Sequence, residues 1–265
     1  FYLIDSGTKS NIAMFSDVNK MENGLQASVP VNIPNPLLRF LYKLHTSIKI
    51  NQVIDLPWKG IWDRYSIFTS LSSGTQWVVM TNWSIRRFSI SCLKELSENP
   101  QCRLVLIYLD TYAKVPEFYK KYINRISFDL IYTFDNQDAE QYGWIFTNSL
   151  YSKNELPNQQ NAENDLYFVG EDKGRTEQLV TIYDFLSRNN IRCCFKIITT
   201  DTKKKSHDGL IFLHKRIGYK EILEDIGKSK AILEIVQDGQ SGMTMRPYEA
   251  MFYDKKFLTN NQCLK

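Results

Sequence analysis

The chain has 265 residues, of which 43% are hydrophobic, and such a chain buries one large or two medium domain cores rather than remaining disordered. Its 33 basic and 29 acidic residues leave a net charge of +4, which suits an anionic ligand or membrane surface but is too small to indicate nucleic-acid binding. No apolar run approaches the roughly 18 residues of a membrane-spanning helix, and the five cysteines show no CxxC spacing. We therefore expect a reduced, cytoplasmic protein that is at most peripheral to the cytoplasmic face of a membrane.

Strands and helices are predicted to alternate along the first half of the chain. The expected strands are residues 1–4, 65–70, 76–81, 103–109 and 128–134, and the expected helices are 37–54, 84–99 and 116–126. The polar residues from 5 to Pro36 predict no regular element. Strands separated by helices pair in parallel through right-handed crossovers, so the predicted fold class is α/β.

The sequence "YSKNELPNQQNAEN" at 151–164 is polar and almost free of large apolar side chains, which is typical of an exposed linker. It predicts an N-terminal domain over 1–155 and a C-terminal domain over 165–265. The alternation then resumes, with strands at 165–170, 191–199, 210–214, 230–236 and 255–259, and helices at 175–190, 219–229 and 247–254. Because the chain begins at Phe1 and stops soon after an expected strand, we expect native residues beyond one or both ends.

A polar loop, "DGQSGMTM", leaves the predicted strand 230–236 and leads into a helix expected to begin near Arg246 and Pro247. Ligands of parallel sheets bind beyond the carboxyl ends of strands, where backbone amides and the positive end of a helix dipole favour anions. Thr244 and Arg246 could supply a hydroxyl and a cation to a phosphate, and Glu249 could accept hydrogen bonds from ligand hydroxyls. The same residue types also make an ordinary helix cap, and both interpretations stay open.

A second glycine loop, "FVGEDKGR" at 168–175, follows the first strand of the C-terminal domain. It is neither GxGxxG nor a P-loop, so the dinucleotide and ATPase signatures are absent. Lys173 and Arg175 could still reach a diphosphate from this position. A plain glycine turn with solvated charges is the alternative.

Together these segments resemble a known family. A strand ending in "VG", a loop with "GR", and the later "E...DGQSGMTMRPYEAM....KFLTNN" are similar to the C-terminal domain of bacterial GT-B glycosyltransferases, above all those that build capsular polysaccharide and lipopolysaccharide. The resemblance covers residues 165–261. It implies two Rossmann-like domains that face each other across a cleft, with the nucleotide sugar held by the C-terminal domain.

The resemblance also implies roles for individual residues. The loop and its helix would face the donor diphosphate, Lys173 or Arg175 would help to neutralise it, and Glu249 would bind ribose or sugar hydroxyls. The loop residues are Gly239, Gln240, Ser241, Gly242, Thr244 and Arg246. The retaining pattern E-x7-E is not found, since eight residues before Glu249 the chain has Ser241, and the stereochemical outcome stays open.

Glycosyl transfer places negative charge on the departing diphosphate, which fixed donors and cations stabilise. The resemblance implies that side chains and a helix end do this without a metal or other cofactor, and the chain has no DxD motif. An inverting enzyme also needs a base for the proton of its glycan or lipid-linked acceptor. Asp110, at the end of the predicted strand 103–109, is the first candidate and Asp55 the second, although each could equally be a loop or capping aspartate.

Two other functions fit the same architecture. A nucleotide-sugar epimerase would use carboxylates at the cleft to move a proton, and a catalytically silent GT-B subunit would only bind partners. The basic run "KKK" at 203–205 is typical of a solvated loop but could also contribute to contact with an anionic membrane.

Overall fold

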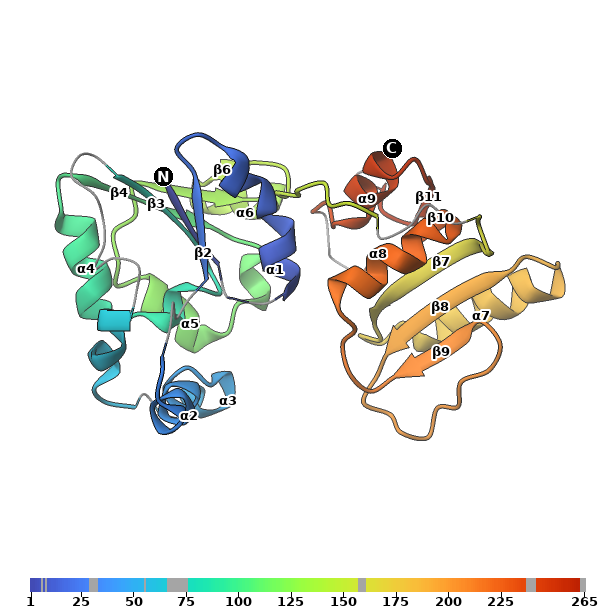
Figure 1. Ribbon diagram of the computed structural model, residues 1–265, viewed down its shortest axis with the longest axis horizontal. Coiled ribbons are helices and arrows are strands. Elements are labelled where there is room, and N and C mark those ends of the chain that lie inside the picture. Colours follow the sequence, from blue (N-terminus) through green and yellow to red (C-terminus); the bar gives the residue numbers. More distant parts are fainter. Residues whose placement is uncertain are drawn as a thin grey trace. The chain divides into compact units, whose positions relative to one another are not determined.

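The computed structural model describes residues 1–5, 7, 9–28, 33–54, 56–65, 76–156, 161–236 and 242–262. The chain divides into two compact units, Phe1–Ser152 and Lys153–Lys265, called the first and the second unit below (Figure 1). The division falls at the start of the polar segment 151–164. Both units are α/β, as the sequence predicts.

In the first unit the structure describes six parallel strands in the order β2-β1-β3-β4-β5-β6. They are β1 Tyr2–Asp5, β2 Leu25–Ser28, β3 Gln76–Thr81, β4 Cys102–Ile107, β5 Leu130–Thr133 and β6 Ile145–Phe146. The α-helices are α1 Lys9–Met14, α2 Pro36–His45, α3 Ile48–Asn51, α4 Ile90–Glu98, α5 Glu117–Ile123 and α6 Asn136–Tyr142. Short 3-10 helices cover Ser16–Lys20, Lys59–Tyr65, Ile85–Arg87 and Tyr112–Lys114. The strand order reverses between β1 and β3.

The main core of the first unit lies on one face of its sheet, under α4 and α5. Leu93 of α4 and Ile123 of α5 belong to the same buried cluster as Val78, Leu104 and Leu106 of the central strands. These strands are apolar on both faces because helices cover parallel sheets from both sides. The central strands are therefore continuous apolar runs, and such runs can be recognised in the sequence.

The second unit contains a five-stranded parallel sheet in the order β11-β10-β7-β8-β9. Its strands are β7 Asn164–Glu171, β8 Cys193–Ile198, β9 Leu210–Leu213, β10 Ser229–Glu234 and β11 Lys256–Thr259, and its helices are α7 Thr176–Arg188, α8 Tyr219–Gly227 and α9 Arg246–Phe252. The order reverses between β7 and β10, which makes this sheet Rossmann-like.

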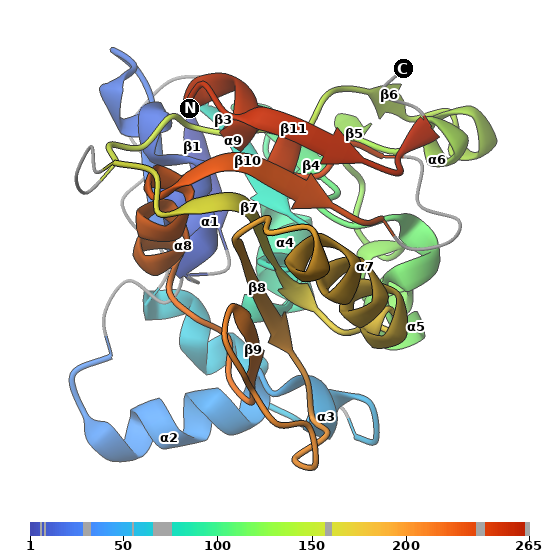
Figure 2. The same cartoon turned by 90° about the vertical axis from the view of Figure 1, so that its right-hand side faces the viewer.

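Successive residues of β7 face different helices of the second unit. Phe168 packs in one core with Leu179 of α7, whereas the hydroxyl of Tyr167 donates to Asp225 of α8 at 3.1 Å. Figure 2 shows α7 and α8 on opposite sides of the sheet. The two loops with candidate binding residues therefore emerge at the carboxyl ends of central, doubly covered strands.

Several sequence predictions are wrong in the first unit. The polar segment before Pro36, expected to lack regular elements, contains α1, a 3-10 helix and β2. The helix expected over 37–54 is two helices, α2 and α3, because the hydroxyl of Thr46 donates back to Tyr42 O at 2.9 Å and Arg86 donates to Thr46 O.

The helix expected over 84–99 begins as the 3-10 helix Ile85–Arg87, and α4 starts only at Ile90. Ser89 caps α4 by accepting from Cys92 N at 3.1 Å, which separates the two segments. The strand predicted at 65–70 lies outside the described residues, apart from Tyr65, which ends a 3-10 helix. Within the described parts of the chain, no helix combines the length and apolar character that crossing a bilayer requires.

Candidate functional site

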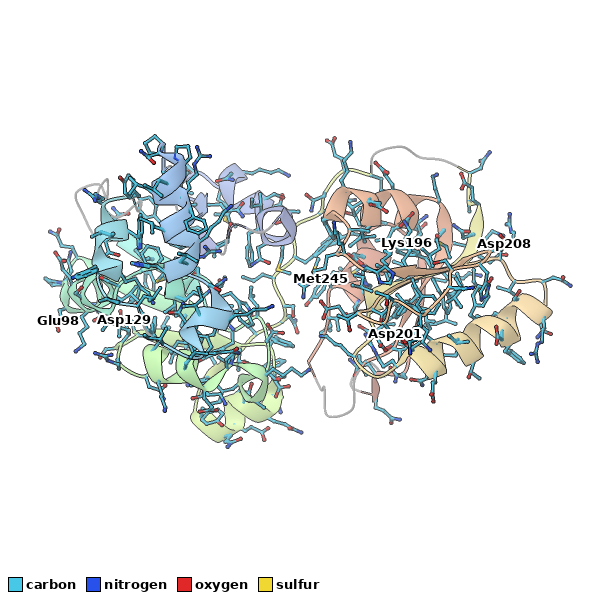
Figure 3. The ribbon with its side chains drawn as sticks, turned by 90° about the horizontal axis from the view of Figure 1, so that it is seen from below. Glu98, Asp129, Lys196, Asp201, Asp208 and Met245 are labelled. Atoms are coloured by element: carbon cyan, nitrogen blue, oxygen red, sulfur yellow. The ribbon has the colours of Figure 1, made fainter. Side chains whose placement is uncertain are left out.

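The candidate site lies where the strand order of the second unit reverses, between the carboxyl ends of β7 and β10. These strands end at Glu171 and Glu234. Parallel sheets bind ligands at such a reversal because adjacent loops there diverge to opposite faces. Figure 3 labels three residues that show the two ends of this sheet. Met245, just before α9, and Asp201, just after β8, lie toward the carboxyl ends of the strands, whereas Asp208 precedes β9 and lies toward the other end.

Arg175 connects the two loops at this reversal. Its guanidinium donates to Ile235 O beyond β10, to Glu171 O at 2.6 Å and to Asp172 O at 3.3 Å. Gly170 leaves room for it, because a Cβ there would lie 3.4 Å from Arg175 Nη2 and 3.2 Å from the ring of Phe168. Burial lowers the pKa of Arg175, and nearby carboxylates oppose the fall. The side chain therefore holds the β7 and β10 loops together with a positive charge between them.

The loop after β7 begins with a cap for α7. Asp172 Oδ1 accepts from Thr176 N at 3.1 Å and from Thr176 Oγ1 at 2.5 Å, and these bonds lower the pKa of Asp172. Lys173 has a positive φ of 46°. Its side chain is 45% exposed, with Nζ 3.9 Å from Glu171 Oε2. Lys173 is thus a solvent-accessible cation of this loop, whereas Asp172 is bonded to Thr176, the first residue of α7.

Glu234, the last residue of β10 and the glutamate of the "E...DGQSG" motif, is a buried carboxylate to which the sequence assigned no role. It accepts from the hydroxyl of Thr259, at the end of β11, at 2.7 Å and from the hydroxyl of Thr244. Thr244 Oγ1 in turn accepts from Arg246 N at 3.1 Å. Glu234 therefore anchors the loop that leads into α9. The available signal was an acidic residue at the end of the apolar run "AILE", where a buried charge needs partners.

Arg246 and Glu249 form a buried ion pair in the first turn of α9. Glu249 is 0% exposed and also accepts from Tyr219 OH of α8 at 3.1 Å. Arg246 Nη2 additionally lies 3.5 Å from Val169 O of β7. Burial raises the pKa of Glu249, and Arg246 and Tyr219 oppose the rise. In this arrangement the pair ties α9 to β7 and α8, and the role of Glu249 toward donor hydroxyls stays a prediction.

The helix that follows the loop begins at Arg246, where Pro247 predicts it. Of the loop residues, Gly242 is buried and Thr244 is half-buried. Four predicted site residues lie outside the described part of the chain: Gly239, Gln240 and Ser241, which were predicted to contact phosphate, and Asp55, the second candidate base.

Asp110 lies in the first unit, beyond the carboxyl end of β4. Its Oδ2 accepts from the indole of Trp83 at 2.7 Å, and Trp83 belongs to the turn after β3. In the first unit the strand order reverses between β1 and β3. The residue at the carboxyl end of β1 is Asp5, which the sequence did not single out. Asp5 is buried and accepts from Gly7 N at 2.5 Å and from Gln26 Nε2 at 2.8 Å. Both carboxylates thus lie near the carboxyl ends of strands and accept hydrogen bonds, Asp110 from Trp83 and Asp5 from Gly7 and Gln26.

Comparison of the chain with models of protein families found no match, and comparison with curated proteins found none either. In the parts of the chain that the structure describes, no group of three or more His, Cys, Asp or Glu side chains could hold a metal ion.

Proposed function

We propose that the chain is a glycosyltransferase of GT-B type that moves a sugar from a nucleoside diphosphate sugar to a glycan or lipid-linked acceptor in surface polysaccharide synthesis. The observation that carries the proposal is the convergence at the β7–β10 reversal of the second unit. Arg175 joins the two loops there, and Glu234 fixes the loop that leads into α9. A rigid, polar reversal point is the usual binding position for a nucleotide on such a sheet.

The chemistry assigned to this site is stabilisation of the leaving diphosphate. Lys173 supplies an accessible ammonium, and Arg175 supplies a fixed charge between the loops. Charges that are already in place stabilise a developing anion without reorganisation. The donor would be held by these groups and by the loop of 235–245, with no bound metal.

The proposal assigns the acceptor to the first unit, with Asp110 as the base. A general base must accept the hydroxyl proton in a hydrogen bond before transfer. The indole N–H of Trp83 holds one oxygen of Asp110 at 2.7 Å, which would fix the orientation of the carboxylate. A lipid-linked acceptor would bring the protein to the cytoplasmic face of a membrane as a peripheral partner.

Calorimetric titration of the intact chain with uridine, guanosine, cytidine and thymidine diphosphates, with and without magnesium, tests the donor site. At least one should bind, with an affinity that magnesium leaves unchanged. Lys173→Ala should weaken that binding about fivefold, as expected for one lost charge contact worth about 1 kcal/mol. Lys228→Ala is the matched control, because Lys228 precedes β10 at the opposite end of the same sheet.

Failure of every nucleotide to bind would refute the proposal, and an absolute need for magnesium would contradict the metal-free mechanism. If a nucleotide binds, incubation with its sugar conjugates and product analysis then identifies the reaction. Slow release of free sugar without acceptor supports a transferase. Formation of an epimer would assign the site to the epimerase alternative, and no turnover at all would favour the silent subunit.

A further inference from the structure

Exposed apolar side chains are concentrated in one segment of the first unit, between residues 37 and 61. Single apolar residues are normal on a protein surface, whereas a concentration of them marks a place where another surface binds. The large apolar side chains exposed in this segment are Leu37, Phe40, Leu41, Val53, Ile54, Trp58 and Ile61. They belong to α2, to the loop after α3 and to the 3-10 helix Lys59–Tyr65. Figure 1 shows α2 and α3 side by side below the sheet of this unit.

The helix α2 has one apolar face that packs on its own unit and a second that faces solvent. Tyr42 lies on the packed face, with its ring centroid 5.5 Å from that of Trp62. Leu37, Phe40 and Leu41 follow the i, i+3, i+4 spacing of one side of a helix and form the second face. Leu37 is 65% exposed and Phe40 is 57% exposed. Attachment of α2 to its unit explains the first face and leaves the second available to a partner.

The loop that follows α3 adds further exposed apolar side chains, among them Val53 and Trp58, and Trp58 is 79% exposed. Both ends of this loop are attached to the end of α2. Before it, Asn51 Nδ2 donates to His45 O at 2.9 Å, and after it, the indole of Trp62 donates to His45 Nδ1 at 2.8 Å. Tryptophan is the side chain most typical of the boundary between lipid and water. The loop and α2 thus form one packed substructure with apolar side chains on its outside.

The charged side chains of α2 and α3 are all basic. Arg39 and Lys43 of α2 and Lys49 of α3 are exposed, and neither helix contains Asp or Glu. Lys43 is three residues after Phe40 and four after Arg39, so these two cations border the exposed apolar face. None of the ion pairs among the described residues involves the three cations. The one acidic residue between 37 and 61, Asp55, lies outside the described residues.

We propose that the surface formed by Leu37, Arg39, Phe40, Leu41 and Lys43, called the α2 surface below, binds the face of a membrane that contains anionic lipid. The apolar side chains would enter the boundary between headgroups and acyl chains, as they do in helices that lie in the plane of a membrane. The guanidinium and the ammonium would bind lipid phosphates, which accept charge-assisted hydrogen bonds. Their long apolar stems can lie along the apolar face while the charged ends reach the headgroups.

Charge favours this partner over a second copy of the chain. A symmetric contact would bring Arg39 and Lys43 of both copies into one interface, where like charges repel each other. An anionic membrane supplies the opposite charge and an apolar interior together. The proposal does not rest on the proposed function, although a transferase with this contact would suit the lipid-linked form of the acceptor.

Sedimentation of the intact chain with vesicles tests the α2 surface. The chain should bind vesicles of phosphatidylcholine mixed with phosphatidylglycerol, and it should bind vesicles of phosphatidylcholine alone much more weakly. High salt should weaken binding to the mixed vesicles, because salt screens exposed charges. The variants described next replace exposed side chains, so they should fold, which circular dichroism checks.

Phe40→Ser should weaken binding to the mixed vesicles about tenfold, because one large apolar side chain is no longer transferred out of water. Phe185→Ser is the matched control, since Phe185 is an exposed phenylalanine of α7 in the second unit. Lys43→Gln should weaken binding about fivefold, the effect of one cation near an anionic surface. Lys94→Gln is its control, because Lys94 is an exposed lysine of α4 in the same unit.

The basic run at 203–205 is the competing candidate for a membrane contact. Its three lysines are exposed and belong to the second unit. Because the proposal places the contact at α2, the triple variant Lys203→Gln, Lys204→Gln, Lys205→Gln should weaken vesicle binding less than Lys43→Gln does, although it removes three charges.

Four results would overturn the proposal. The chain does not bind the mixed vesicles, Phe185→Ser weakens binding as much as Phe40→Ser, or the triple variant weakens it more than Lys43→Gln. The fourth is a dimer in sedimentation velocity that Phe40→Ser dissociates, which would assign the α2 surface to a second copy. Vesicle binding by a chain that binds no nucleotide would refute the proposed function and leave this inference intact, whereas nucleotide binding without vesicle binding would do the reverse.

Discussion

Replacing Glu249 with Gln removes the negative charge of the buried ion pair and keeps the shape of the side chain. Gln can still accept the hydrogen bond from Tyr219, which is 3.1 Å long. What changes is that the guanidinium of Arg246 loses its counter-charge. The expected result is a less stable second unit, because a charge left in a poorly solvated position is costly.

The size of the loss follows from the burial of the two partners. Removing one member of a buried ion pair typically costs roughly 3–5 kcal/mol. Arg246 keeps 18% of its side-chain surface exposed, whereas Glu249 is 0% exposed. Because water still solvates part of the guanidinium, we expect the lower end of the range, about 3 kcal/mol. Adding Arg246→Met should recover part of the loss, since no charge then stays buried.

The distribution of tryptophan makes the assay specific. All five tryptophans lie in the first unit, so tryptophan fluorescence follows that unit, whereas far-UV circular dichroism follows both. In urea, Glu249→Gln should move the unfolding transition seen by circular dichroism and leave the fluorescence transition in place. Glu224→Gln is the control, because Glu224 is an exposed glutamate of α8 and such changes usually stay within about 0.5 kcal/mol.

A loss below about 1 kcal/mol, similar to a surface substitution, would refute the reasoning. The informative combination is unchanged stability together with weaker nucleoside diphosphate binding. That result would show that Glu249 serves the ligand, as the resemblance to GT-B enzymes implies, and that the ion pair contributes little to the fold.

Three further outcomes are expected. Asp172→Ala should cost the second unit about 1 kcal/mol through loss of the α7 cap. The native pKa of Asp172 is lowered, so this contribution is present above the unfolded value near pH 4 and lost as the pH falls below it. Arg175→Lys should cost roughly 1.5–3 kcal/mol, because an ammonium cannot reach both loops as the guanidinium does. Burial raises the pKa of Cys92 to about 12 and of Cys193 to about 11. In a Cys263→Ser variant at pH 8, both should therefore be alkylated much more slowly in native than in urea-unfolded protein.

Each outcome has a direct check. Urea titrations between about pH 3 and 7, which span the ordinary aspartate pKa of roughly 3.9, should show the Asp172→Ala difference shrinking toward acid, and a constant difference would contradict the assignment. For Arg175→Lys, unaltered stability would mean that the bonds to the loop carbonyls contribute nothing. Mass spectrometry counts the alkylated thiols, and equal native and unfolded rates would disprove the effect of burial.

The central strands could be predicted from the sequence alone. Runs such as "RLVLIYL" and "DLYFVG" are apolar at successive positions, which is characteristic of strands covered on both faces. They correspond to β4 and β7. The start of α9 could also be predicted from local sequence, because Pro247 suits only the first turn of a helix. The edge strand β2 carries no such pattern, and it was missed because its first residue, Leu25, is 45% exposed and the strand exists by pairing with β1.

The partners of the polar side chains were decided only by the tertiary structure. Local sequence places Glu249 in the first turn of a helix, yet its burial depends on Tyr219, which is 30 residues away. The break after His45 requires Arg86, which is 40 residues from Thr46. Lys59 and Arg125 line one pocket of the first unit although they are 125 − 59 = 66 residues apart in the chain. Backbone preference and apolar period act over a few neighbouring residues, and therefore the sequence by itself determined the class, the central strands and the loops at their ends. Charge pairing and cavities act through space, so only the folded chain decided which of those side chains meet.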